Sequence, residues 1–116
     1  MQMTIGGFFD EVKELLDVAA QSSYTDAQLC RFVVDGLRRL YAVRPATRYV
    51  DGQIADPAFP SDTALLKAFS VDIEPRFRLG VVYYAAGRAH EVGVTDTVNL
   101  QLAQTLKKQG DDVFMS

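Results

Sequence analysis

The sequence predicts a mostly α-helical single domain, a small four-helix bundle-like fold with an irregular middle loop. Apolar residues recur at spacings of three and four along separate segments, which is the pattern of amphipathic helices. Residue types that begin and end helices flank these segments. The composition is globular, with 48% hydrophobic and 23% charged residues in 116, the size of one domain. The predicted helices span about residues 7–20, 26–43, 75–92 and 96–109.

The first predicted helix, about residues 7–20, carries one apolar face and acids near its start. Asp10 and Glu11 fall in its predicted first turn, where the helix dipole favours negative charge. The residues of the apolar face are Phe8, Phe9, Val12, Leu15, Leu16 and Ala19.

The second predicted helix, residues 26–43, has clear signals at both ends. Thr25 is a good N-cap, and Gln28 three positions later completes a capping box. Pro45 disfavours helical geometry at the residue before it and so ends the helix. Gly36 lies mid-helix at a cost of about 1 kcal/mol relative to alanine, which predicts that another element crosses closely there. The predicted apolar face is Leu29, Phe32, Val33, Leu37, Leu40 and Tyr41.

The middle of the chain, residues 45–73, reads as an extended loop. It contains three prolines and the turn signal Asp51-Gly52, which could join residues 49–54 into a small hairpin. Ser61-Asp62 could cap a short helix over residues 63–67. Loops of this length are usually functional or flexible.

The third and fourth predicted helices form an antiparallel hairpin. Pro75 occupies the preferred first position of the third helix, and Gly93 stops it. Thr95-Asp96 caps the fourth helix, and Gly110 terminates it. The expected buried stripes are Phe77, Val81, Tyr84, Ala85, Ala89 and Val92 in the third helix, and Val98, Leu102 and Leu106 with Leu100 and Ala103 in the fourth.

The chemistry-bearing residues predict no catalytic, cofactor or metal site. The single histidine, His90, and the single cysteine, Cys30, lack the partners that a metal site or an activated nucleophile needs, and no disulfide can form within the chain. No glycine-rich phosphate-binding motif occurs, and Asp111-Asp112 falls in a predicted tail with nothing to hold it. No segment has the length of apolar residues that spans a bilayer, and no leader peptide is expected.

Five arginines gather between positions 31 and 48, in a chain whose net charge is -3. The first interpretation is a solvated helix face with intrahelical pairs to Asp35, the one acid among them. The second is a basic lining that meets DNA without sequence specificity, and the third is a protein interface, where arginine is enriched. The five residues are Arg31, Arg38, Arg39, Arg44 and Arg48.

The C-terminal segment, residues 110–116, reads as a tail with three consecutive apolar residues, Val113, Phe114 and Met115. One interpretation is that Phe114 folds back onto the core of its own domain. The other is that the tail anchors the protein on a neighbour by inserting its aromatic ring. On the second interpretation, deleting residues 111–116 leaves the domain folded and impairs docking.

The order of these pieces resembles the head–tail adaptor (connector, or head completion) proteins of tailed bacteriophages. The resemblance rests on a capped helix, YTDAQLCRFVVDGLRRLYAVRP, an irregular middle, and a helical hairpin, EPRFRLGVVYYAAGRAHEVGVTDTVNLQLAQTLKKQ. In that family the second helix often ends in an Arg-Pro step, matched by Arg44-Pro45. The late helix often carries a Tyr-Ala-x-x-Arg-Ala run, matched by residues 84–89. Many relatives carry a longer β-rich insertion than residues 45–73.

The resemblance implies a structural protein of the virion neck, made in the host bacterial cytoplasm. It implies a homo-oligomeric ring, commonly twelve-fold, that docks on the portal protein and receives tail or tail-completion proteins. DNA would pass through its channel without specific recognition. No catalysis, cofactor or membrane is required, and Val113, Phe114 and Met115 become candidate portal anchors.

Two other classes of function compete with this expectation. A small helical DNA-binding or regulatory module could place Arg38, Arg39 and Arg44 in a major groove, although the net negative charge disfavours this. A small enzyme ranks last, because no acid–base pair is placed.

Overall fold

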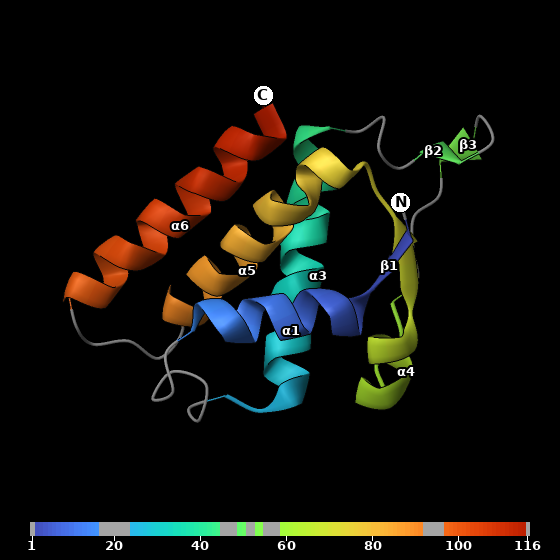
Figure 1. The fold of residues 1–116 in the computed structure, drawn as a ribbon, viewed down its shortest axis with the longest axis horizontal. Helices are drawn as coiled ribbons and strands as arrows, with labels where there is room; N and C mark the ends of the chain where they lie inside the picture. Colours follow the sequence, from blue (N-terminus) through green and yellow to red (C-terminus); the bar gives the residue numbers. More distant parts are fainter. Residues whose placement is uncertain are drawn as a thin grey trace.

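The computed structural model describes residues 2–16, 24–44, 49–50, 53–54, 59–91 and 97–115, and it confirms a mostly α-helical small domain. Figure 1 shows α5 and α6 side by side and α1 crossing α3, with the short strands at one edge. The elements are β1 (Gln2–Thr4), α1 (Ile5–Leu15), α3 (Asp26–Val43), β2 (Tyr49–Val50), β3 (Gln53–Ile54), α4 (Thr63–Ala68), β4 (Ser70–Asp72), η2 (Pro75–Phe77), α5 (Arg78–Glu91) and α6 (Thr97–Met115).

Helix α1 begins two residues earlier than the sequence pattern predicts. Thr4 is its N-cap, and its hydroxyl accepts a hydrogen bond from the Gly7 amide at 3.1 Å. Asp10 and Glu11 therefore lie beyond the first turn, so their predicted role there is wrong. Glu11 instead forms an ion pair with Arg78, at the start of α5. The helix ends at Leu15, and the predicted continuation beyond residue 16 lies outside the described residues.

Helix α3 is the central element and has the predicted bounds. The capping box of Thr25 and Gln28 is present, with the backbone N–H of Gln28 donating to Thr25 Oγ1 at 3.2 Å. The helix contacts α1, α4, α5 and α6. The close crossing predicted at Gly36 is confirmed, because a Cβ there would lie 2.9 Å from the Val81 carbonyl oxygen of α5. All six residues of the predicted apolar face are buried.

The middle segment contains more regular structure than a loop. Strands β2 and β3 pair as the predicted hairpin, with Tyr49 opposite Ile54. Helix α4 is capped by Asp62, whose side chain accepts from the Leu65 amide at 3.0 Å. Strand β4 then pairs antiparallel with β1, with Met3 opposite Val71. The sequence pattern did not predict this sheet, because two three-residue strands far apart in the chain carry almost no periodicity.

The C-terminal end of helix α6 is where the structure differs most from the sequence-based prediction. Gly110 does not terminate the helix, which continues to Met115, so residues 110–115 do not form a free tail. A Cβ on Gly110 would lie 2.7 Å from the Gly80 carbonyl oxygen, so this glycine permits the close approach of α5 and α6. Phe114 is fully buried, with its ring 6.5 Å from that of Phe77. Phe114 is therefore part of the domain's own core and not an exposed anchor.

The prediction of which residues of the helical hairpin are buried is right only in part. Phe77, Val81, Ala85 and Ala89 are buried as predicted, whereas Tyr84 is only half-buried. In α6, Ala103 is buried and Leu106 packs partly against the core, but Leu102 is 42% exposed. The predicted positions Val92, Gly93, Thr95, Asp96, Val98 and Leu100, like Ala19 of the first stripe, lie outside the residues or side chains that the structure describes.

Candidate binding groove and the arginine residues of α3

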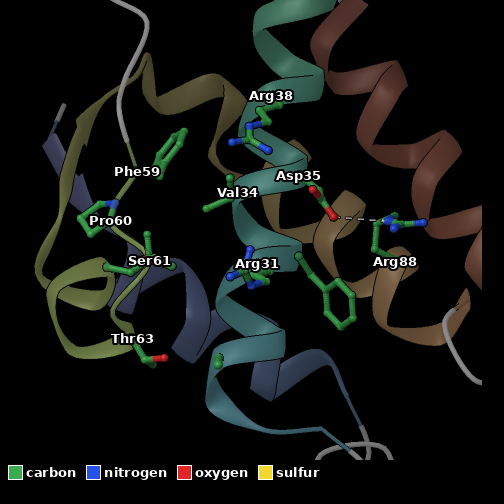
Figure 2. Close-up of a pocket in the computed structure, with 12 residues that line it drawn as sticks. Arg31, Val34, Asp35, Arg38, Phe59, Pro60, Ser61, Thr63 and Arg88 are labelled. Carbon is green, nitrogen blue, oxygen red and sulfur yellow. Dashed lines mark ion pairs between the residues drawn. The ribbon is translucent and has the colours of Figure 1, made fainter.

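A groove of about 370 Å³ lies between α3 and the segment of residues 59–66. Figure 2 shows Arg31, Val34 and Arg38 along α3, facing Phe59 and Pro60 across the groove. We call this feature the α3 groove. Its lining residues are Ala27, Arg31, Phe32, Val34, Asp35, Arg38, Phe59, Pro60, Ser61, Thr63, Leu66 and Arg88.

The sequence of α3 explains why one stripe of this helix lines the groove. Ala27, Arg31, Val34 and Arg38 follow one another at intervals of three and four, so they lie on one face. Arg31 and Arg38 are exposed, and Val34 between them is buried and forms part of the floor. The other faces of α3 pack against its neighbouring helices.

The second wall is held in place by contacts of α4 and its flanks. Lys67 Nζ lies 2.9 Å from an Asp26 carboxylate oxygen, which connects α4 to the start of α3. The hydrogen bond from Lys67 lowers the pKa of Asp26 below its ordinary value. The Lys67 ammonium also lies 4.3 Å from the centre of the Phe9 ring in α1. The Phe59 ring packs on Phe69 with centroids 5.4 Å apart, so the wall is continuous with the domain's apolar side chains.

The α3 groove has an excess of positive charge. Three arginines and one aspartate line it, which leaves two positive charges in a chain whose net charge is -3. Arg88 of α5 pairs with Asp35 at 3.5 Å. The Arg38 guanidinium lies 5.8 Å from the centre of the Phe59 ring, so this arginine reaches across to the second wall. Anionic groups are therefore the ligands that this groove is suited to bind.

The five clustered arginines have different environments. Arg39 donates two hydrogen bonds to the carboxylate of Asp111, at 2.9 and 3.0 Å, and this interaction raises the pKa of Arg39. Arg44 donates to the Phe114 carbonyl oxygen at 2.6 Å. These two side chains join α3 to the end of α6, while Arg31 and Arg38 face the α3 groove. Arg48 lies outside the described residues.

The contacts of these arginines test the interpretations that the sequence suggested for them. Asp35 pairs with Arg88 and Arg39 with Asp111, both between helices. The two predicted intrahelical pairs, Arg31–Asp35 and Asp35–Arg39, are therefore wrong. Asp111, which the sequence placed in an unstructured tail, is held by that bidentate contact. Sequence reasoning also missed the second wall of the groove, because no pattern in the sequence places Phe59 and Pro60 beside α3. The seven-residue interval between Arg31 and Arg38 was the one usable sign of a shared face.

The single histidine and cysteine have structural environments. His90 is buried near the end of α5, with 9% of its surface exposed. Cys30 is fully buried in α3, and burial raises the pKa of its thiol above the ordinary value. A raised pKa keeps the thiol protonated at neutral pH, and the protonated form is a poor nucleophile.

We therefore expect Cys30 to resist modification in the folded protein. Reaction with a chromogenic disulfide reagent at neutral pH should be at least about a hundredfold slower than in denaturant, because it requires transient opening of the domain. The chain has one cysteine, so the absorbance change reports on this residue alone. Equal rates in native buffer and in denaturant would show that the thiol is accessible and the placement of α3 is wrong.

No group of three or more histidine, cysteine, aspartate or glutamate residues could hold a metal ion within the described part of the chain. Among the described residues, no helix is both long and apolar enough to cross a membrane. Comparison of the chain with protein-family models, with curated proteins and with solved structures found no match.

Proposed function

We propose that the protein is a head–tail adaptor of a tailed bacteriophage, a structural subunit of the virion neck. It assembles as a ring, with twelve copies the expected number, between the portal protein and the tail or its completion proteins. The ring extends the channel through which DNA passes. Its role is to connect these parts, and no catalytic step is assigned to it.

The observation that carries the proposal is the position, within the fold, of the residues that resemble the adaptor family. The run of residues 84–89 lies at the contact of α5 with α3 and α6: Ala85, Ala86 and Ala89 are fully buried there. A Cβ on Gly87 would lie 2.9 Å from the Ala103 carbonyl oxygen, so only glycine allows this helix approach. The residues that resemble the adaptor family therefore form the junction of the helical body.

The arginine of the Arg-Pro step, Arg44, also joins two elements of the helical body. Arg44 donates to the Phe114 carbonyl oxygen, and its guanidinium lies 5.7 Å from the centre of the Phe77 ring. Arg88, the arginine of the Tyr-Ala-x-x-Arg-Ala run, pairs with Asp35 of α3. Both arginines join helices within one subunit, which supports a rigid body suited to repeated packing in a ring.

The shape and surface of the subunit are also compatible with a ring. Its extents are 45 × 32 × 18 Å, so it is a thin slab with broad faces. Subunits in a ring meet through two different surfaces, whereas a two-fold dimer uses one surface twice. Exposed leucines occur on four different helices, which offers more than one apolar contact surface: Leu15 in α1, Leu65 in α4, Leu79 in α5 and Leu102 in α6.

The alternative, a DNA-binding module that inserts α3 into a major groove, receives no support from the contacts of α3. Nine residues of this helix are buried, and it contacts four other helices. Arg39 and Arg44, two of the three arginines that were expected to meet DNA, contact Asp111 and Phe114 within the domain. A recognition helix needs one face open to the base edges. The face of α3 with the exposed Arg31 and Arg38 instead has residues 59–66 opposite it across the α3 groove.

Co-purification with the portal protein encoded in the same genome tests the proposal. We expect the two proteins to elute together as a complex far larger than either subunit, with portal and terminase genes near the gene for this chain. Leu65→Asp and Leu79→Asp change exposed leucines, and at least one should release the subunit from the ring. Gln104→Asp, an exposed polar position on α6, is the matched control and should not.

Two results would contradict the proposed function. A protein that remains monomeric beside its portal protein, at concentrations where known adaptors assemble, contradicts the proposal. A genome without a portal gene also contradicts it.

A further inference from the structure

We propose that the α3 groove binds an acidic, extended peptide segment of a partner protein. This inference concerns a binding site on the subunit surface and does not rest on the adaptor function. It rests on the spacing of two arginines, the excess of positive charge, and the apolar floor and wall between them.

The spacing of the arginines defines two points of attachment. Arg31 and Arg38 are seven residues apart on α3, two helical turns, so their backbones are separated by about 10.5 Å along the helix axis. Both side chains are exposed, and within the described part of the chain neither forms an ion pair with an acid. Arginine binds a carboxylate through two parallel hydrogen bonds, so each arginine can hold one acidic side chain.

The conformation of the peptide follows from this distance. In a polyproline II segment, residues at i and i+3 lie on the same side, about 9.3 Å apart. This value is close to the separation of the two arginines. Two acidic residues at i and i+3 of an extended segment can therefore contact Arg31 and Arg38 together. The flexible arginine side chains cover the remaining difference.

The apolar surface between the arginines favours a peptide over a simple anion. Val34 and Leu66 are buried at the floor, and Phe59 and Pro60 form the facing wall. An apolar side chain between the two acids would cover this surface. The volume of about 370 Å³ accommodates a few side chains and no folded domain.

A peptide is also favoured over nucleic acid. Asp35 lies inside the groove, and its pairing with Arg88 at 3.5 Å reduces the repulsion that it exerts on an anion of either class. The whole chain carries a net charge of -3, which opposes a polyanion of phosphates at every step along its length. A short peptide with two acids meets only the local positive charge.

Fluorescence anisotropy with synthetic peptides tests the proposal. The probe is a fluorescein-labelled peptide with glutamates at i and i+3 and a leucine between them, and the matched probe has glutamine at both positions. We expect the glutamate peptide to bind and the glutamine peptide to bind at least about tenfold more weakly. Raising sodium chloride from about 0.1 M to about 1 M should weaken binding, because it shortens the range of charge interactions.

Charge-reversal variants of the full chain locate the site. Arg31→Glu and Arg38→Glu should each weaken binding about tenfold, because each removes an attraction and adds a repulsion. Lys108→Glu changes the net charge by the same amount at an exposed position of α6 outside the groove, and it should change the affinity less than about twofold. All three positions are exposed or on the surface, so circular dichroism and the melting temperature should match the wild type.

Chemical-shift mapping on the wild-type protein gives an answer that needs no variant. The peptide should perturb amides of residues 27–38 and 59–66. Perturbation elsewhere, equal binding of the glutamine peptide, or an equal loss in Lys108→Glu would overturn the proposal. A labelled oligothymidylate that binds the same residues more tightly than the peptide would replace it with a nucleic-acid site.

Discussion

Phe114→Ala is expected to lower the free energy of unfolding by about 3–5 kcal/mol. The ring of Phe114 is fully buried and lies against Phe77 and Gly80, so its removal leaves a cavity between α5 and α6. A domain of this size has a total stability of about 5–15 kcal/mol, so the loss is a large part of the whole. Denaturant unfolding followed by circular dichroism measures it.

Met115→Ala is the matched control, because Met115 follows Phe114 in the same helix but is 61% exposed. Its effect should stay within about 0.5 kcal/mol. Removal of residues 111–116 takes away Phe114, the Asp111 partner of Arg39 and the carbonyl oxygen that Arg44 contacts. We therefore expect the truncated protein to be unfolded or severely destabilised. Equal and small effects of Phe114→Ala and Met115→Ala would mean that this segment is a free tail after all.

Val81→Asp should unfold the protein. The Val81 side chain is fully buried where α5 crosses α3 at Gly36, and a charge there has no partner. Burying an unpaired carboxylate costs several kcal/mol, or requires its protonation. We expect a loss of the cooperative thermal transition at neutral pH, measured by circular dichroism.

Leu102→Asp separates this structure from the pattern-based expectation. The sequence placed Leu102 in the buried stripe of the fourth helix, whereas 42% of its surface is exposed. Its substitution by aspartate should cost less than about 1 kcal/mol, and the protein should keep a cooperative transition. If Leu102→Asp unfolds the protein as Val81→Asp does, the rotation of α6 about its axis is different from the one described.

The parts of the fold that the sequence predicted share one property: their signals are local. The bounds of α3 follow from Thr25, Gln28 and the Arg44-Pro45 step, which act within one turn of the helix ends. The pairing of β2 with β3 was predicted from the Asp51-Gly52 dipeptide in the sequence between them, which is a local turn signal. The crossing at Gly36 could be predicted because a mid-helix glycine is unfavourable unless a neighbour requires it.

The parts that sequence reasoning missed depend on contacts between distant segments. Gly110 has the residue type of a helix terminator, and only the approach of Gly80 explains why it lies inside α6. The pairing of β1 with β4 joins residues about seventy positions apart, which no local pattern encodes. Only one side of the α3 groove could be predicted from the sequence, because the spacing of Arg31 and Arg38 places them on one helix face. Phe59 lies opposite them only because of the way the middle segment folds.

Electron microscopy of the purified chain with its portal protein tests the proposed neck function most directly. The proposal predicts a ring of this protein, expected to be twelve-fold, stacked on the portal ring around a continuous central channel. Each subunit should fit the slab of 45 × 32 × 18 Å, with α6 packed in its body through Met115. Portal rings that carry no added density, with this protein remaining as separate monomers, would contradict it.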